Sequence, residues 1–358
     1  QIAGTVMLLE EKERKRIAGT VINKFRGDVS ILEPGLKMLE DRTDIPVLGV
    51  VPYFYLDLDE EDSLTERFQK KEKPGLIDLA VIRFPRISNF TDLAPLEALE
   101  EVSVRYVSSP AEFGNPDAVI LPGTKNTISD LLWMRQNGLE ARVLKHSAQN
   151  KPVFGICGGY QMLGETIRDP YQGENGGSMK GMGLLPAATE LKQKKTRTQV
   201  TGTFGKISGA LSGLSGKSVR GYEIHMGSTV DSGSNVDNRS TADGGSIVDS
   251  ERVINPESRG NEKRYMCRIQ NEADGSVKYD GIFSGNVYGT YVHGIFDEGT
   301  LAETLVGILA ERKGVVLDTG QMISYGQFKQ MQYDKLADGL RESMDMEAVY
   351  AMLREAAI

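Results

Sequence analysis

A chain of 358 residues with 39% hydrophobic and 26% charged side chains is long enough for two globular domains, each with its own core. Its 50 acidic residues exceed its 42 basic ones, and the net charge of -8 argues against nucleic acid or an anionic membrane as the main partner, since both need a basic face. Two cysteines are too few for a disulfide framework or a cysteine zinc site, so we expect no metal site and a reducing, cytoplasmic environment.

The first 75 residues are predicted to be the end of a β-α-β domain followed by a linker. Apolar runs at 17–22 and 46–52 are typical of buried parallel strands, and the pattern at 31–43 predicts an amphipathic helix between them. Ligands of such sheets lie at the carboxyl ends of strands, where Asn23 follows the first run, although a residue that only ends a strand gives the same pattern. The charged segment 57–74 is the predicted linker.

From residue 76 onward, strands alternate with helices. Apolar runs at 76–82, 102–107 and 118–121 predict strands, and a helix is expected over 128–137. Such alternation favours a doubly wound α/β sheet. We expect this second domain to extend over 76–358.

Later segments of the second domain differ in composition. Residues 228–261 are rich in Ser, Gly, Asn and Asp and predict a flexible surface insertion without a core of its own. A β-rich run follows at 287–292, and 301–312 and 333–358 are predicted to be amphipathic helices on the outside of the sheet.

A cysteine lies where an apolar run, 153–156, meets two glycines that open a helix. A side chain at the tip of such a strand-to-helix turn needs strained backbone geometry and small neighbours, here Gly155, Gly158 and Gly159. The first turn of the helix also aims N–H groups and a positive dipole at the sulfur. Cys157 is therefore a candidate nucleophile, although a buried structural cysteine in a glycine-rich turn gives the same pattern.

A cysteine nucleophile needs a base that takes its proton and later returns it to a leaving amine. The chain has three histidines, and His293 directly follows the strong apolar run at 287–292. Because imidazole titrates in the required range, His293 is the candidate base.

Residues 155–161, together with the Pro122-Gly123 turn and the strand end at His293, resemble the class I glutamine amidotransferases. Four motifs in the right order along the chain resemble, more closely, the cobyric acid synthase family of cobalamin biosynthesis, at residues 23–28, 121–127, 220–227 and 289–296. The resemblance covers nearly the whole chain outside the insertion.

The resemblance implies a role for individual residues. Cys157 would attack the carboxamide of glutamine to give a thioester and ammonia, with His293 as base and then acid. The backbone N–H groups of Gly158 and Gly123 would form the oxyanion hole, where losing one donor typically costs ~3 kcal/mol. Gln161 matches a position that contacts substrate glutamine.

The chain departs from the wider class next to the histidine. Many class I enzymes have a glutamate two residues after it, and here that position is Ile295. We expect a Cys157–His293 dyad, with Asp297 and Glu223 as alternatives for a carboxylate that orients the imidazole.

A second departure concerns ATP. The family resemblance implies an N-terminal domain similar to dethiobiotin synthetase, with a phosphate-binding loop of the type G-x-x-x-x-G-K-[ST], and this sequence contains no such loop. Residues 1–75 would be the remnant of that domain, in which Asn23 matches a position near the nucleotide base. ATP and Mg²⁺ are expected for a longer enzyme, and glutaminase activity for this chain.

The resemblance implies transfer of glutamine-derived ammonia to peripheral carboxylates of the corrinoid adenosylcobyrinic acid a,c-diamide, giving adenosylcobyric acid. Alternatives are a cobyrinate a,c-diamide synthase, a cell-wall amidotransferase, or a ligand-binding module without activity. The joint presence of Cys157, Gly158, Gly123 and His293 argues against the last.

Overall fold

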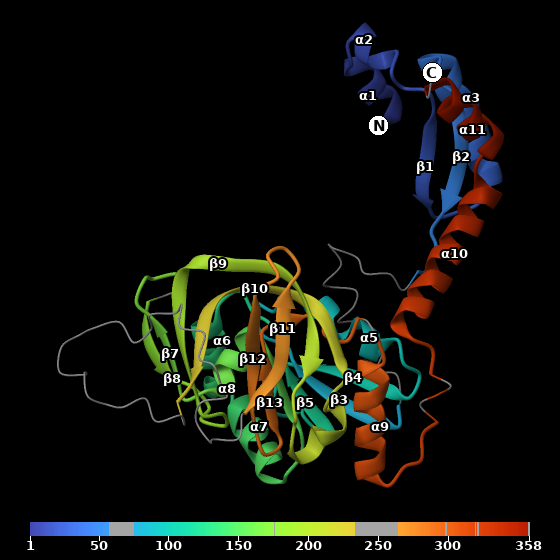
Figure 1. Cartoon of the computed structure of the whole chain (residues 1–358). Helices are drawn as coiled ribbons and strands as arrows, with labels where there is room; N and C mark the ends of the chain where they lie inside the picture. The colour runs from blue at the N-terminus through green and yellow to red at the C-terminus, as the bar shows by residue number, and fades with distance from the viewer. Residues whose placement is uncertain are drawn as a thin grey trace. The chain divides into compact units, whose positions relative to one another are not determined.

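The computed structural model describes residues 1–56, 75–174, 176–232, 264–297, 299–318, 320 and 322–356. Two compact units are present: Gln1–Leu58 together with Gln327–Ile358, and Asp59–Gly326 (Figure 1). The predicted linker at 57–74 lies outside the described residues. None of the described helices is both long and apolar enough to span a membrane.

The first unit contains the predicted β-α-β arrangement. Strands β1 (Thr20–Phe25) and β2 (Val47–Pro52) are parallel, and α3 (Val29–Thr43) connects them. The Asp28 side chain starts α3 by accepting a hydrogen bond from the Ser30 N–H at 2.9 Å. Two short helices, α1 (Ile2–Leu8) and α2 (Glu11–Arg14), precede β1.

The first strand continues three residues beyond its predicted end. Asn23 therefore lies within β1, and its side-chain oxygen accepts a hydrogen bond from the Lys24 N–H at 2.8 Å. A role for Asn23 in binding a nucleotide stays a prediction.

The C-terminal helices do not belong to the second unit. Most of α10 (Tyr325–Ser343) and all of α11 (Met346–Ala356) group with the first unit. The Asp345 N–H donates to the Leu48 carbonyl at 2.7 Å, and Lys335 Nζ donates to the Tyr55 carbonyl at 3.0 Å. The expected domain at 76–358 differs from this division, because an amphipathic pattern gives a helix an apolar face without specifying which strands it covers.

The second unit is built on a twelve-stranded sheet. Its main order is β14-β10-β9-β11-β12-β13-β6-β5-β3-β4, with β7 and β8 attached beside β9. Strands β13, β6, β5, β3 and β4 pair in parallel, and the pairs from β14 to β13 are antiparallel. The strand bounds are β3 Ile77–Ile82, β4 Val102–Val107, β5 Ala118–Leu121, β6 Val153–Ile156, β7 Thr166–Asp169, β8 Gly177–Lys180, β9 Ala187–Phe204, β10 Ser218–Asp231, β11 Tyr265–Asn271, β12 Val277–Ser284, β13 Val287–Thr290 and β14 Val292–His293.

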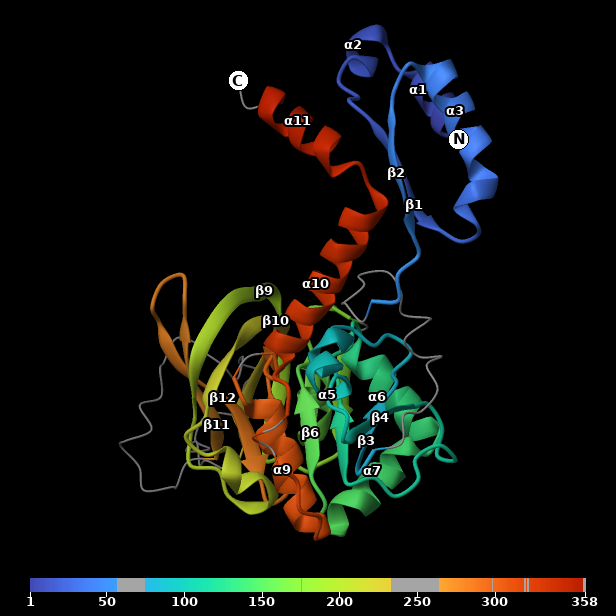
Figure 2. The ribbon, with the colours of Figure 1, turned by 90° about the vertical axis from the view of Figure 1, so that its right-hand side faces the viewer.

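Helices cover both faces of the parallel strands, as predicted for an α/β sheet. In both ribbon views α9 lies on the opposite side of these strands from α6 and α7 (Figures 1 and 2). The bounds are η1 Phe90–Leu93, α5 Ala94–Glu97, α6 Thr127–Gln136, α7 Leu139–Ala148, α8 Gly158–Leu163, η2 Gly209–Leu214 and α9 Leu301–Lys313. One apolar core runs through the unit, and its largest fully buried side chains include Tyr160, Tyr288 and Phe84.

The predicted insertion begins later than expected. Residues 228–231 are the end of β10 and pair with β9, because Thr229 and Val230 continue the ladder opposite Thr189 and Ala188. Residues 233–261 of the predicted insertion lie outside the described residues.

We predict that Gly49→Ala loosens the C-terminal segment from β2. A Cβ at Gly49 would lie 2.2 Å from the Ser343 carbonyl oxygen, so the segment must shift. In hydrogen exchange, we expect the Asp345 amide to exchange about tenfold faster or more. Gly35→Ala is the matched control, since a Cβ there has no neighbour closer than 3.9 Å and alanine favours a helix. Unchanged exchange at Asp345 would contradict the packing described above.

Candidate active site at Cys157

Cys157 occupies a strained turn between β6 and α8. Its φ of 52° and ψ of -108° are unusual for a residue with a side chain, and such conformations typically cost ~1–3 kcal/mol. The Cys157 N–H donates to the Thr290 carbonyl of β13 at 2.8 Å. The predicted strand-to-helix elbow is confirmed, with the thiol 8% exposed.

Glycines make this turn possible because other chain segments pass very close. A Cβ on Gly159 would lie 2.0 Å from the Leu121 carbonyl oxygen, and one on Gly155 would lie 2.6 Å from the Leu163 side chain. A Cβ on Gly158 would lie 2.7 Å from Thr124. The elbow is therefore packed directly against the end of β5.

His293, at the end of β14, is buried and held by a carboxylate. Its Nδ1 lies 2.7 Å from Asp92 Oδ2, and the other oxygen of Asp92 accepts the Gly294 N–H at 2.8 Å. Both side chains are only 1% exposed. Because a carboxylate accepts, Nδ1 carries the proton, which leaves Nε2 to face the site.

The charge of Asp92 controls the protonation of His293. Burial by itself would lower the pKa of His293, but the hydrogen bond and charge of Asp92, together with the neighbouring Cys157 side chain, raise it to about 10. In the described part of the chain, Nε2 of His293 has no hydrogen-bond partner. At neutral pH the imidazole is protonated and can act as an acid.

An aromatic ring fixes the plane of the imidazole. Tyr222 of β10 stacks on His293 with ring centroids 5.4 Å apart, and the Asn89 side-chain amide donates to the Tyr222 hydroxyl at 2.8 Å. Asn89 immediately precedes η1, which carries Asp92. The loop that supplies the carboxylate therefore also supports the stacked ring.

The Gly123 turn reaches the same place from the end of β5. A Cβ on Gly123 would lie 3.1 Å from His293 Cε1, so the turn contacts the imidazole edge. The turn is anchored by the buried Asp130, whose carboxylate accepts hydrogen bonds from the Thr124 hydroxyl and the Arg86 N–H. Gly123 and Gly158 thus both lie next to the catalytic candidates, and their role as an oxyanion hole stays a prediction.

Gln161 is buried one helical turn beyond Cys157. Its Oε1 accepts from the Thr127 hydroxyl at 2.9 Å, and its Nε2 donates to the Tyr291 hydroxyl at 3.1 Å. These contacts fix its side chain between α6 and the crossover from β13 to β14. The predicted contact with substrate glutamine is not tested by them.

We expected a Cys157–His293 dyad without a carboxylate, with Asp297 and Glu223 as the alternative carboxylates that orient the imidazole. These expectations were wrong, because another carboxylate binds the ring. That carboxylate is Asp92. Asp297 lies against the backbone of Gly294 instead, and the Glu223 side chain contacts His225 and Lys278. Glu223 follows Tyr222 in β10, so alternation along the strand turns it away from His293.

Sequence reasoning missed Asp92 because it lies 201 residues from His293. One signal was available: Asp92 is the only charged residue in the segment 88–96, between Phe90 and Leu93. A carboxylate in such an apolar stretch is expected to be buried with a partner.

Among the described residues, no group of three or more His, Cys, Asp or Glu side chains is arranged to hold a metal ion. The site at Cys157 brings together a thiol, an imidazole paired with a carboxylate, and backbone N–H groups.

This chain is similar to a family of glutamine amidotransferases and to individual proteins of known name. Residues 78–301 match the model of the CobB/CobQ-like glutamine amidotransferase domain. The chain is 52% identical to a cobyric acid synthase of Ruminiclostridium cellulolyticum over 98% of its own length and 63% of the relative's, and 47% identical to one of Lachnoclostridium phytofermentans over 99% and 66%. It thus spans less than two thirds of either relative.

A solved structure, PurLQS from Thermotoga maritima, is similar over 66% of this chain and 99% of its own, with 14% identity and a TM-score of 0.43.

We predict that Asp92 is the cause of the raised pKa of His293. In Asp92→Asn, burial is no longer offset by the carboxylate, so the pKa of His293 should fall by several units from about 10. Titration of the imidazole by ¹⁵N NMR measures this change. Asp297→Asn is the control and should leave the titration nearly unchanged, and an equal fall in both variants would show that Asp92 has no special role.

Proposed function

The chain belongs to the CobB/CobQ-like glutamine amidotransferase domain family, and from this premise we propose that its second unit hydrolyses glutamine through a cysteine thioester. The observation that carries the proposal is the arrangement of Cys157 on a strained elbow beside a protonated His293 that Asp92 holds.

The reaction follows from the positions of these groups. The Cys157 sulfur attacks as a thiolate paired with the imidazolium of His293, and the carbonyl oxygen of the glutamine carboxamide becomes an oxyanion that the N–H groups of Gly158 and Gly123 stabilise. When the C–N bond breaks, His293 gives its proton to the departing nitrogen, which leaves as ammonia. The neutral His293 then takes a proton from water, the hydroxide cleaves the thioester to glutamate, and the sulfur leaves as the thiolate beside the restored imidazolium.

Asp92 contributes in two ways. It holds the imidazole with Nε2 toward the reacting atoms, and it stabilises the imidazolium that the cycle requires. The three groups form a triad in which the carboxylate comes from a segment far earlier in the chain than the family pattern around the histidine indicates.

We propose that the ammonia serves cobalamin biosynthesis, through ATP-dependent amidation of peripheral carboxylates of adenosylcobyrinic acid a,c-diamide to adenosylcobyric acid. The support is the shared name of the relatives that match 98% or more of the chain. A cobyrinate a,c-diamide synthase, in which the same cysteine chemistry would serve a different acceptor, is the second candidate, and the matched family is described as both CobB-like and CobQ-like. A cytoplasmic location is part of the same proposal.

For ATP and Mg²⁺, neither a phosphate-binding loop of the type G-x-x-x-x-G-K-[ST] in the sequence nor a metal-binding cluster among the described residues is present. We therefore assign no step of the ATP-dependent reaction to the residues described above and propose that it requires the longer protein.

We expect Cys157→Ala to lower glutamine hydrolysis by at least about 10³-fold, because the thioester cannot form. Release of glutamate and ammonia measures the rate, and a chloroketone analogue of glutamine should label the wild-type chain at Cys157. Cys267→Ala is the matched control: burial raises the pKa of Cys267 well above its usual range, which makes that thiol unreactive. Unchanged turnover in Cys157→Ala would refute the proposed nucleophile.

We also expect that this chain, supplied with glutamine, ATP, Mg²⁺ and the corrinoid diamide, hydrolyses glutamine without releasing phosphate. The full-length protein should release phosphate under the same conditions, and the labelled amide should appear on the corrinoid. Phosphate release by this chain alone would contradict the proposal that the ATP-dependent reaction requires the longer protein.

A further inference from the structure

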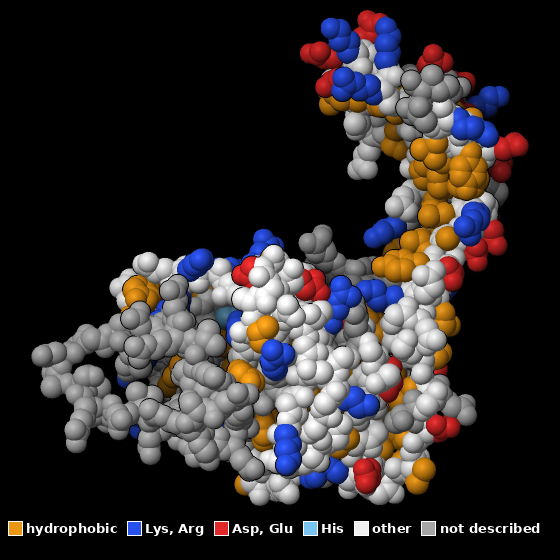
Figure 3. Space-filling view, viewed as in Figure 1, with side chains coloured by type: hydrophobic (Ala, Val, Ile, Leu, Met, Phe, Trp, Pro, Cys, Tyr) orange, Lys and Arg blue, Asp and Glu red, His pale blue; other side chains and the backbone are white. Residues whose placement is uncertain are grey.

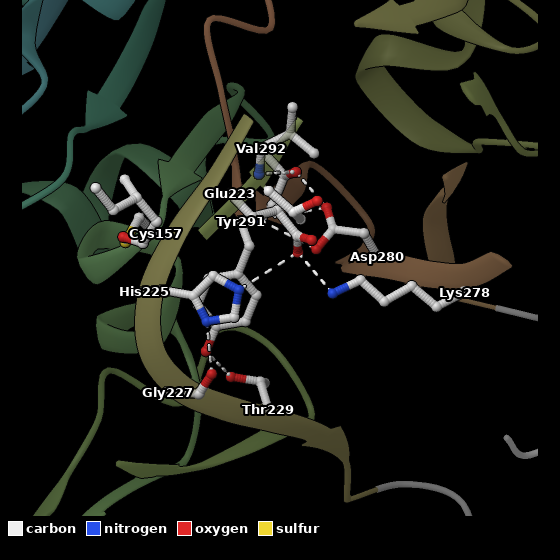
Figure 4. A network of polar contacts seen from close by, with 12 residues as sticks. Cys157, Glu223, His225, Gly227, Thr229, Lys278, Asp280, Tyr291 and Val292 are labelled. Carbon is white, nitrogen blue, oxygen red and sulfur yellow. Dashed lines mark hydrogen bonds and ion pairs between the residues drawn. The ribbon is translucent and has the colours of Figure 1, made fainter. Parts of the chain in front are cut away.

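A buried polar cluster lies on the other side of β10 from Cys157. We name it the Asp280 cluster; Figure 4 shows Cys157 on one side of the strand and the cluster on the other. Strand geometry explains the separation, since Tyr222 faces His293 and the next side chain must face away. The cluster consists of the buried Glu223 and His225 of β10, Asp280 of β12, Thr290 at the end of β13 and Tyr291 just beyond it, with the exposed Lys278 of β12 at its edge.

Asp280 binds the point at which β13 passes into β14. Its carboxylate accepts hydrogen bonds from the Thr290 hydroxyl and from the Tyr291 N–H, the latter at 3.3 Å from each oxygen. The Thr290 hydroxyl in turn accepts the Val292 N–H at 3.0 Å. Asp280 therefore binds two residues of the crossover directly and a third, Val292, through the Thr290 hydroxyl.

The crossover carries both catalytic candidates. The Thr290 carbonyl accepts the N–H of Cys157 at 2.8 Å, which holds the strained elbow. His293 follows three residues later, where β14 pairs with Tyr222 and Glu223 of β10. A shift of Thr290 would therefore move the thiol and the imidazole relative to each other.

The charge of an ionised Asp280 would strengthen the hydrogen bonds that it accepts from the crossover. Burial and then the charge of Glu223 raise the pKa of Asp280, whereas the hydrogen bonds from Thr290 and Tyr291 and the charge of Lys278 lower it and favour the ionised carboxylate. Lys278 donates to Glu223 at 2.8 Å and balances the pair of carboxylates. An ionised carboxylate offers two acceptor oxygens, which its two donors need.

We propose that Asp280 is a positioning residue for glutamine hydrolysis, acting through Thr290 on the Cys157 elbow and on the strand that carries His293. The inference rests on the proposed function. It assigns no contact between Asp280 and glutamine, so its loss should reduce kcat with little effect on KM.

The sharpest test is a pair of variants at Thr290. Thr290→Val keeps the shape of the side chain but has no hydroxyl, and Thr290→Ser keeps the hydroxyl. We expect Thr290→Val to lower kcat about tenfold or more with KM within twofold of wild type, and Thr290→Ser to stay within threefold of wild type in both.

Two further variants complete the experiment. Asp280→Asn keeps the shape with one acceptor oxygen instead of two, and its kcat should fall as in Thr290→Val. Asp274→Asn, on the exposed loop between β11 and β12, should match wild type. If circular dichroism shows that Thr290→Val or Asp280→Asn does not fold, the other of these two variants still tests the proposal.

The outcomes separate the two proposals. A wild-type chain that does not hydrolyse glutamine overturns the proposed function, and the positioning role is then judged by the alkylation rate of Cys157 with iodoacetamide in a Cys267→Ala background. Slower alkylation in Thr290→Val than in Thr290→Ser supports the role. Equal kcat or equal alkylation in these two variants overturns it.

Discussion

The backbone conformation of Cys157 is the constraint on which the second unit depends. A residue with a side chain adopts φ 52° and ψ -108° only when its surroundings compensate the strain. Here the compensation comes from the neighbouring parallel strands: the Thr290 carbonyl of β13 accepts the Cys157 N–H, and the Pro122 carbonyl after β5 accepts the Gly159 N–H. The three strands therefore have to end at the same edge, which brings their following loops together.

Two buried carboxylates hold the segment 290–294 from opposite sides of β10. Asp92 binds the ring of His293 and the N–H of Gly294, and Asp280 binds the hydroxyl of Thr290 and the N–H of Tyr291. Burying a carboxylate is costly unless it is hydrogen-bonded, and each of these accepts one backbone and one side-chain donor. The same contacts that satisfy the buried charges thus fix the position of the imidazole.

The local patterns of the sequence were informative wherever a feature depends on near neighbours. The apolar run that ends at Cys157, with glycines at 155, 158 and 159, predicted the elbow, because the close approaches require residues without a Cβ. Alternation of strands and helices predicted the α/β class, and the end of the run at 287–292 placed His293 at the end of a strand. The strand at 228–231 was missed because its composition resembles that of the insertion that follows.

The sequence by itself determined the candidate nucleophile, its candidate histidine partner and the family. Each of these is carried by short motifs, and the residues within one motif are close together in the sequence. Only the tertiary structure decided which carboxylate faces the imidazole and which unit the C-terminal helices join. Asp92 and His293 are in contact although 201 residues separate them in the sequence, and α11 contacts β2 although most of the chain lies between them. Such pairings depend on how the strands are ordered in the sheet, and neither residue spacing nor an amphipathic pattern contains that order.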